Sequence, residues 1–250
     1  MPMVKVKKIA IVTITLFPAF IQRYAEFGII ARAILNKRLS WKALDLRQFG
    51  LDARQTVDDR PYGGGVGMVL RPDVLFKAIQ LARSKSKAKT RVILLTPSGK
   101  QFQQKDAVRL AKYDELVFVS ARYEGYDERI TKFVDEELSI GDYVLMGGEL
   151  PALVIAEAVL RNVPGVLGKD ESAVGESFSD RMLEYPQYTK PETWIVETRN
   201  KKQETRKKKF LRVPGVLLTG HHANIQEWRI AEAVRRTKKR RPDLLNSSKH

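Results

Sequence analysis

The chain has 250 residues, 43% of them hydrophobic, and a formal net charge of +16. This length and composition allow a large buried core and exclude a disordered chain. The sequence has no cysteine and only three histidines, two of them adjacent, so it excludes disulfides, iron–sulfur clusters and thiol nucleophiles and makes a zinc site a poor interpretation.

The N-terminal segment combines lysines with an apolar run at residues 9–17, a pattern that resembles a signal peptide. No small-residue cleavage site follows this run. No apolar run reaches the 18 or more residues that a membrane span needs. We therefore expect a cytoplasmic protein that does not associate with membranes.

Short β-branched runs alternate with helical patterns over the first two thirds of the chain. The expected strands are residues 8–13, 40–46, 91–95, 115–120 and 143–146. The expected helices are residues 20–36, 73–84, 104–113 and 152–161. This alternation predicts an α/β domain with a mainly parallel sheet, and ligands bind such sheets beyond the carboxyl ends of the strands.

Three expected strands end in loops that carry glycine or proline, at residues 94–100, 119–129 and 144–151. Each loop alone is also typical of an ordinary strand-to-helix turn. Together they could wall one pocket. A fourth element, residues 56–72, packs four glycines into positions 63–67, which indicates backbone that approaches a flat ligand closely.

The last third of the chain is polar and basic. Residues 165–186 show no sustained period and are typical of a linker, and the segment after them shows helical patterns. Residues 181–250 hold 18 lysines and arginines against seven acidic residues, a net charge of +11. A field of this sign favours a polyanion, most commonly a nucleic acid.

Six motifs carry a resemblance to a known family. They are VDDRPYGGGVGM, RYEGYDER, SIGDYVLMGGELPAL, PGVLG, ESFSDRMLEYPQYTKP and RRPDLL. In order and near-spacing they resemble the bacterial tRNA (guanine-N1)-methyltransferases of the TrmD family, in the SPOUT methyltransferase superfamily. The resemblance covers residues 8–245.

This resemblance implies a SPOUT-type α/β fold, with a mainly parallel sheet and a C-terminal trefoil knot, in an obligate homodimer. Three parts are expected: a cofactor-binding domain at residues 1–165, a mobile linker at 166–185 and a small helical, basic tRNA-binding domain at 186–250. The implied reaction transfers a methyl group from S-adenosylmethionine to N1 of guanosine 37 in tRNA, 3′ of the anticodon. Magnesium is a candidate ion, although no ligand cluster in the sequence identifies a metal site.

The resemblance also implies a cofactor pocket. By motif match, its wall contains Leu95, Pro97, Tyr123, Glu124, Gly125, Ile140, Gly141, Tyr143, Leu145, Gly147, Gly148 and Pro151. The carboxylate of Glu124 would attract the positive charge of the cofactor. The alternative is that Glu124 is a surface partner of Arg122 or Arg129.

On the substrate side, the resemblance places Glu176 as the base that removes the N1 proton and Arg161 at the O6 edge of guanine. Ser177 follows Glu176 directly in the sequence and is expected to contact the guanine, and Glu184 is the next glutamate along the same segment. Asp58 and Gly67 match positions that help to hold the neighbouring nucleotide. The family usually has aspartate where this chain has Glu176.

An apparent insertion at residues 194–212 is longer and more basic than the usual connector. It is either an additional contact with the tRNA backbone or a solvated loop. Two other functions compete with the main hypothesis: an RNA-binding module without catalysis, and a SPOUT enzyme that methylates another RNA, for example at a ribose 2′-hydroxyl.

Overall fold

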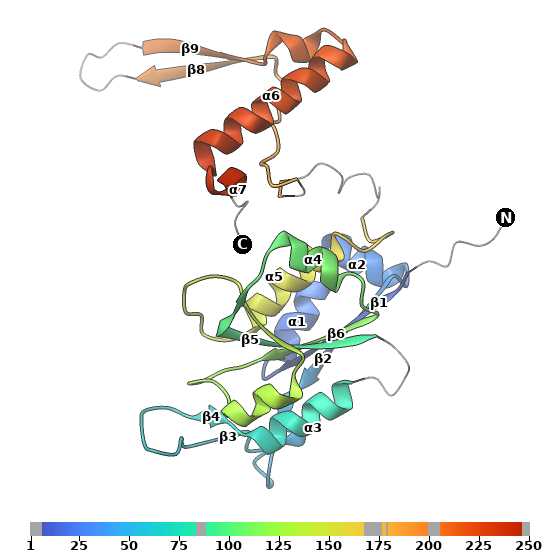
Figure 1. Cartoon of the computed structure of the whole chain (residues 1–250), viewed down its shortest axis with the longest axis vertical. Helices are drawn as coiled ribbons and strands as arrows, with labels where there is room; N and C mark the ends of the chain where they lie inside the picture. The colour runs from blue at the N-terminus through green and yellow to red at the C-terminus, as the bar shows by residue number, and fades with distance from the viewer. Residues whose placement is uncertain (1–6, 84–88, 168–176, 179, 200–205, 247–250) are drawn as a thin grey trace, which may run out of the picture. The chain divides into compact units, whose positions relative to one another are not determined.

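A computed structural model describes residues 7–83, 89–167, 177–178, 180–199 and 206–246, in two compact units that divide between Ala173 and Val174 (Figure 1). Half of the predicted linker at residues 166–185 lies outside the described residues. The first unit contains a five-stranded sheet in the order β2-β1-β6-β5-β7, and every strand pair in it is parallel. This confirms the predicted α/β architecture.

The strands of this sheet alternate their side chains between two hydrophobic clusters. They are β1 (Ile9–Thr15), β2 (Leu39–Asp45), β5 (Thr90–Gln101), β6 (Glu115–Ser120) and β7 (Glu136–Ser139). In β6, Leu116 and Phe118 belong to one cluster, and Val117 and Val119 belong to the other. All four side chains are buried, so both faces of the sheet are covered.

Helices cover the two faces unequally (Figure 1). One face packs against α2 (Gly28–Leu35), α4 (Gln104–Leu110) and α5 (Glu149–Leu160), with α1 (Pro18–Ala25) beside β2. The other face packs against α3 (Pro72–Ala82) and the 3₁₀ turns Leu46–Phe49 and Glu128–Phe133. A short antiparallel pair, β3 (Asp58–Asp59) and β4 (Val69–Leu70), flanks the glycine-rich element.

Two predicted elements of the first unit are wrong. The single helix expected at residues 20–36 is two helices, because Phe27 adopts an extended conformation (φ −115°, ψ 150°) between them. The strand expected at residues 143–146 is an exposed loop, in which Val144 and Met146 are about nine-tenths exposed. The last strand is instead β7, whose acidic residues hide it from a search for apolar runs.

The second unit is not purely helical, which corrects the predicted small helical domain. It contains the long helix α6 (His222–Arg240), the short helix α7 (Asp243–Asn246) and a 3₁₀ turn at Gly215–Leu218. It also contains an antiparallel hairpin of β8 (Thr193–Arg199) and β9 (Arg206–Arg212). The hairpin occupies the apparent insertion at residues 194–212, where the charge of the sequence obscured the alternation of TWIVETR.

Candidate active site

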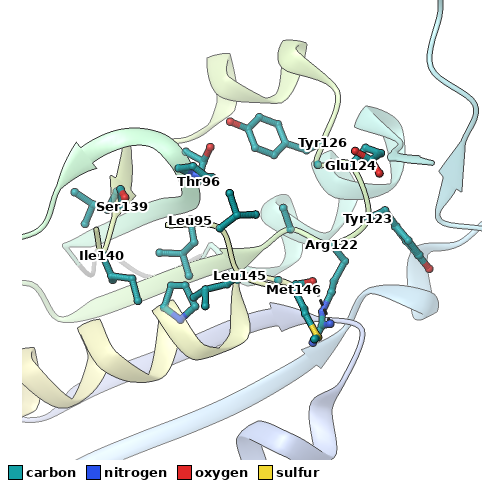
Figure 2. A pocket seen from close by; sticks show the side chains of 18 of the residues that line it. Leu95, Thr96, Arg122, Tyr123, Glu124, Tyr126, Ser139, Ile140, Leu145 and Met146 are labelled. Atoms are coloured by element: carbon teal, nitrogen blue, oxygen red, sulfur yellow. Dashed lines mark hydrogen bonds between the residues drawn. The ribbon is translucent and has the colours of Figure 1, made fainter. Parts of the chain in front are cut away.

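Three loops meet at the carboxyl edge of the parallel sheet. The first is a bulge in β5: both Leu95 and Lys100 pair with Leu138, so that residues 96–99 loop out of the ladder. The others are residues 121–127 after β6 and residues 140–148 after β7. Together they enclose a pocket of about 410 Å³ (Figure 2), a volume that suits a small organic ligand.

All twelve residues of the predicted cofactor wall line this one pocket. They are Leu95, Pro97, Tyr123, Glu124, Gly125, Ile140, Gly141, Tyr143, Leu145, Gly147, Gly148 and Pro151. The structure therefore brings together residues that are up to 56 positions apart in the sequence. Sequence reasoning missed other lining residues of the same loops, among them Thr96, Arg122, Tyr126, Ser139 and Met146 (Figure 2).

A buried ion pair joins two of these loops. Glu149, in the first turn of α5, is 2% exposed, and its Oε2 accepts a hydrogen bond from Arg122 Nε at 2.9 Å. Its Oε1 accepts a hydrogen bond from the Thr15 hydroxyl at 2.8 Å. Arg122 Nη1 also donates to the carbonyl of Met146 at 3.2 Å, and its guanidinium lies 4.4 Å from the centre of the Phe17 ring. Arg122 thus fixes the loop after β6 to the loop before α5.

Gly148 allows the loop before α5 to touch the end of β6. Its N–H donates to the carbonyl of Ala121 at 2.9 Å. A Cβ at this position would lie 2.7 Å from the Cα of Ser120, closer than any side chain can approach backbone. The glycine pair that ends the loop is therefore explained by close packing against the sheet as well as by the pocket that it lines.

Glu124 lies at the opposite end of the pocket from Ile140 (Figure 2). The structure pairs both of its suggested partners with other acids, Arg122 with Glu149 and Arg129 with Asp127 at 2.7 Å. Within the described part of the chain, the exposed carboxylate of Glu124 forms no ion pair. It is therefore available to a ligand at the mouth of the pocket.

Tyr126 closes the pocket between the bulge of β5 and β7. Its hydroxyl donates to Glu137 Oε2 at 3.3 Å. Burial is the largest influence on this hydroxyl and raises its pKa, and the negative charge of Glu137 acts in the same direction, against hydrogen bonds with Thr96 and Ser98. Tyr126 therefore stays neutral near pH 7 and serves as a hydrogen-bonding group.

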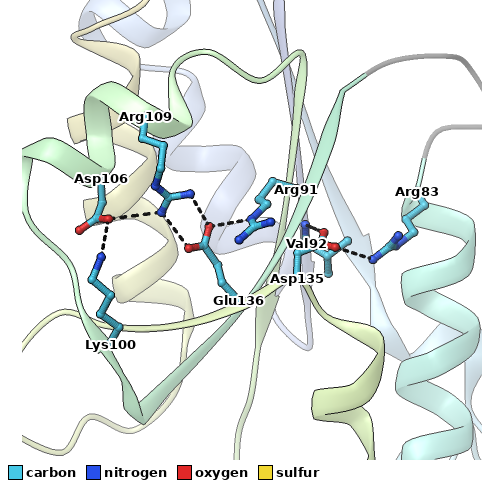
Figure 3. Close-up of polar contacts among 8 residues, drawn as sticks. All are labelled: Arg83, Arg91, Val92, Lys100, Asp106, Arg109, Asp135 and Glu136. Atoms are coloured by element: carbon cyan, nitrogen blue, oxygen red, sulfur yellow. Dashed lines mark hydrogen bonds and ion pairs between the residues drawn. The ribbon is translucent and has the colours of Figure 1, made fainter.

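A polar network supports the bulge from behind (Figure 3). Lys100, at the end of the bulge, donates to the buried carboxylate of Asp106 on α4 at 2.8 Å. Arg109 joins Asp106 to Glu136 on β7, with Nη2–O distances of 3.3 and 2.8 Å. The network ties β5, α4 and β7 together at the position where the ladder is interrupted.

The glycine-rich element is bonded to the mouth of the pocket. The N–H of Leu70 donates to the carbonyl of Gly125, and the N–H of Glu124 donates to the carbonyl of Met68, both at 3.0 Å. Gly67 (φ +90°) lies against Glu124, so closely that a Cβ would overlap its side chain. Asp58 lies opposite Leu70 in the β3–β4 pair. The structure thus places the predicted substrate residues Asp58 and Gly67 on the element that borders the pocket.

The remaining predicted substrate residues are divided between the two units, with Arg161 in the first and Ser177 and Glu184 in the second. Arg161 is the C-cap of α5, whereas Gly148 is its N-cap, and a helix of 12 residues is about 18 Å long. Ser177 and Glu184 lie in the second unit and contact each other, since the N–H of Glu184 donates to the Ser177 hydroxyl at 3.0 Å. The predicted base Glu176 lies outside the described residues.

The described residues contain neither a cluster of metal-ligating side chains nor a membrane-spanning helix. No group of three or more His, Cys, Asp or Glu side chains among them is arranged to hold a metal ion. Among the helices of these residues, none combines the length and the apolar composition that crossing a lipid bilayer requires.

Comparison with known proteins places the chain among characterised sequences. Residues 8–247 match the family model described as tRNA (Guanine-1)-methyltransferase TrmD. The chain is 45% identical to the tRNA (guanine-N(1)-)-methyltransferase of Shouchella clausii over 232 residues, 93% of this chain and 89% of that protein. It is 45% identical over 233 residues to the Bacillus subtilis protein of the same name, covering 93% and 90% of the two chains.

Proposed function

The chain belongs to the tRNA (guanine-N1)-methyltransferase family, and from this premise we propose that it transfers the methyl group of S-adenosylmethionine to N1 of guanosine 37 in tRNA, 3′ of the anticodon. One observation carries the proposal: the family-matched residues of the three loops line a single pocket of about 410 Å³. We place the reaction in the cytoplasm, where tRNA is the substrate.

The pocket suits the nucleoside part of the methyl donor. Leu95, Ile140 and Leu145 supply apolar contacts, and the backbone of the glycine-containing loops supplies polar groups at the edges. Glu124 at the mouth would attract the amino group or the sulfonium. When bound, S-adenosylmethionine supplies an electrophilic methyl group. The residues of this chain hold the guanine in line with this methyl group and remove the proton from its N1.

In the proposed mechanism, Glu176 removes the proton from guanine N1, which is protonated near neutral pH. Negative charge then grows on O6, and the guanidinium of Arg161 stabilises it. Asp58 and Gly67, on the element that borders the pocket, hold the neighbouring nucleotide. Ser177 and Glu184, which are hydrogen-bonded to each other, provide polar groups beside the general base Glu176.

We propose a homodimer because Arg161 and the cofactor pocket lie at opposite ends of α5 within one chain. Gly148 and Arg161 are at opposite ends of α5, so one chain does not bring its own Arg161 to its own pocket. A partner related by a two-fold axis would supply the arginine. The loop of residues 140–148 returns to the end of β6 after β7 has joined the far edge of the sheet, which supports the trefoil knot of the SPOUT fold.

Subunit mixing tests the shared site. In a mixture of Arg161→Ala chains and Gly148→Val chains, each heterodimer would contain one site with an intact pocket and an intact arginine. We expect about a quarter of wild-type activity, from random pairing of equal amounts. A mixture as inactive as either variant alone would place both groups in one subunit.

Methylation of defined tRNA transcripts tests the reaction itself. We expect 1-methylguanosine at position 37, located by mass spectrometry, and no product when guanosine 37 is replaced. A 2′-O-methylated ribose, or binding of RNA without binding of S-adenosylmethionine, would overturn the proposal in favour of the two alternative functions.

A further inference from the structure

The β8–β9 hairpin carries large apolar side chains in solvent on a strongly basic segment. Trp194, Ile195 and Phe210 are each more than half exposed. Residues 193–212 contain eight lysines and arginines against two glutamates. Exposed aromatic and aliphatic groups normally mark a surface that binds something, and the charge favours a polyanion.

The register of the hairpin separates these side chains into two faces. Residues directly opposite each other in an antiparallel pair share a face. One face, here called the tryptophan face, contains Trp194 opposite Leu211 and Val196 opposite Lys209. The other, the phenylalanine face, contains Thr193 opposite Arg212, Ile195 opposite Phe210 and Glu197 opposite Lys208.

The two faces differ in charge. On the phenylalanine face, the ammonium of Lys208 lies 3.5 Å from the carboxylate of Glu197, so its charge is partly compensated. The tryptophan face has no acidic residue, and Lys209 forms no ion pair with any residue that the structure describes. The phenylalanine face also carries the exposed Arg212. What sets the tryptophan face apart is that it has no acidic residue and presents the larger aromatic ring, Trp194, on the same side as the uncompensated Lys209.

We propose that the tryptophan face binds unpaired nucleotides of the substrate tRNA, with the indole of Trp194 stacked on a base and Lys209 beside a phosphate. This inference rests on the proposed function for its ligand. The hairpin is then a substrate-binding element additional to the pocket and the glycine-rich element.

The chemistry favours unpaired RNA over the other polyanions and over protein. The major groove of an RNA duplex is too deep and narrow for a ribbon to read, whereas unstacked bases are free to stack on aromatic rings. Lysine is depleted from protein interfaces, which speaks against a protein partner on this face.

The two faces supply matched variants for the test. Trp194→Ala removes the aromatic group of one face and Phe210→Ala that of the other; Lys209→Ser and Lys208→Ser make the same change of charge at adjacent positions. The measurements are the Kd for a tRNA transcript over a series of salt concentrations, and the Kd for S-adenosylmethionine as a check on folding.

We expect Trp194→Ala to weaken tRNA binding by about 5- to 150-fold, and Phe210→Ala by less than about twofold, since stacking on one base is lost only in the first. Trp194→Phe should restore most of the affinity. Lys209→Ser should lower the slope of log K against log salt by about 0.7, and Lys208→Ser by clearly less. Affinity for S-adenosylmethionine should be unchanged in all five variants.

Unchanged tRNA affinity in Trp194→Ala, or equal losses in the Trp194 and Phe210 variants, would overturn the inference. A change of oligomeric state in Trp194→Ala with unchanged RNA affinity would do the same and identify a contact between copies of the chain. Failure of the proposed function is distinguishable, because wild-type protein would then methylate no guanosine 37 whatever the binding series shows.

Discussion

The two units of this chain are stabilised by different amounts of buried surface. The first contains two hydrophobic clusters, one on each face of its sheet, with side chains such as Phe118 and Ile93 fully buried. Among the described residues of the second, Thr237 alone is fully buried. Small units that bury little apolar surface are marginally stable without a ligand or partner. The comparison indicates that a large core supports the pocket of the first unit, whereas the described part of the second unit has little core of its own.

The largest expected effect separates chemistry from cofactor binding. Glu176 is the proposed base, whereas the residues that line the pocket lie between Leu95 and Pro151 in the sequence. Glu176→Gln keeps the shape of the side chain and removes its basicity, so the single-turnover rate should fall about 10²- to 10⁴-fold, or about 3 to 5 kcal/mol. Calorimetry should show unchanged affinity for S-adenosylmethionine. A rate within about threefold of wild type would move the base to Glu184 or to water.

Truncation of one apolar side chain in each unit measures the difference in packing. Phe118→Ala should lower the free energy of unfolding by about 3 to 5 kcal/mol, because it leaves a cavity between the sheet and its helices. Ile230→Ala on α6 should cost less than about 0.5 kcal/mol, since this side chain is 55% exposed. Denaturant unfolding of the two variants checks both values. Similar costs would contradict the comparison.

Breaking the ion pair of the loops tests whether the pocket is rigid before the cofactor binds. Glu149→Gln leaves Arg122 without its carboxylate, so we expect a loss of about 1 to 3 kcal/mol in stability together with weaker binding of S-adenosylmethionine. Asp127→Asn is the control, because its pair with Arg129 is largely exposed and should contribute less than about 1 kcal/mol. Loss of stability without loss of cofactor affinity would show that the pair supports the fold alone.

The smallest effect concerns pH and the network behind the bulge. Burial alone would raise the pKa of Asp106, but the hydrogen bond and charge of Lys100, with Gln103 and Arg109, lower it below its ordinary value. A depressed folded-state pKa contributes stability above the unfolded pKa of about 4 and loses it as the pH falls through the folded value. Asp106→Asn should therefore lower Tm at pH 7, and this difference should shrink below about pH 4.

Thermal unfolding of wild type and Asp106→Asn across this range provides the measurement. The matched control is Asp243→Asn in the second unit, whose pair with Arg241 is exposed and should leave Tm nearly unchanged. A Tm difference for Asp106→Asn that stays constant down to about pH 2.5 would show that the carboxylate's charge is not what stabilises the bulge.

The sequence predicted the parallel sheet and the pocket loops because both leave local signals. Buried parallel strands are continuous apolar runs, as in residues 115–120, and the loops carry glycines at fixed motif positions. The strand β7 was missed because its Glu136 is neutralised by Arg91 and Arg109, which are far away in the sequence. The same reason hid the pair of Arg122 and Glu149: a buried charge is recognisable only with its partner.

In two other segments, the composition of the sequence predicted the wrong local structure. The run of residues 143–146 is apolar enough for a strand, yet it pairs with none of the described strands, because its loop turns back toward the end of β6, where the N–H of Gly148 donates to the carbonyl of Ala121. In residues 193–212 the lysines dominate the composition, and the pairing of Trp194 with Leu211 appears only when both strands are aligned. Propensity was overridden by tertiary pairing in both segments.

The strand order has a consequence for synthesis on the ribosome. β6 lies between β1 and β5, so the β1–β2 pair and β5 join into one sheet only when residues 115–120 have emerged from the ribosome. Until then, β1 and β5 each present an unpaired edge, and exposed edges of this kind promote aggregation. Nascent chains of fewer than about 120 residues should therefore depend on chaperones, and a truncation before β6 should be insoluble where one after α5, which completes the cover of one face of the sheet, is not.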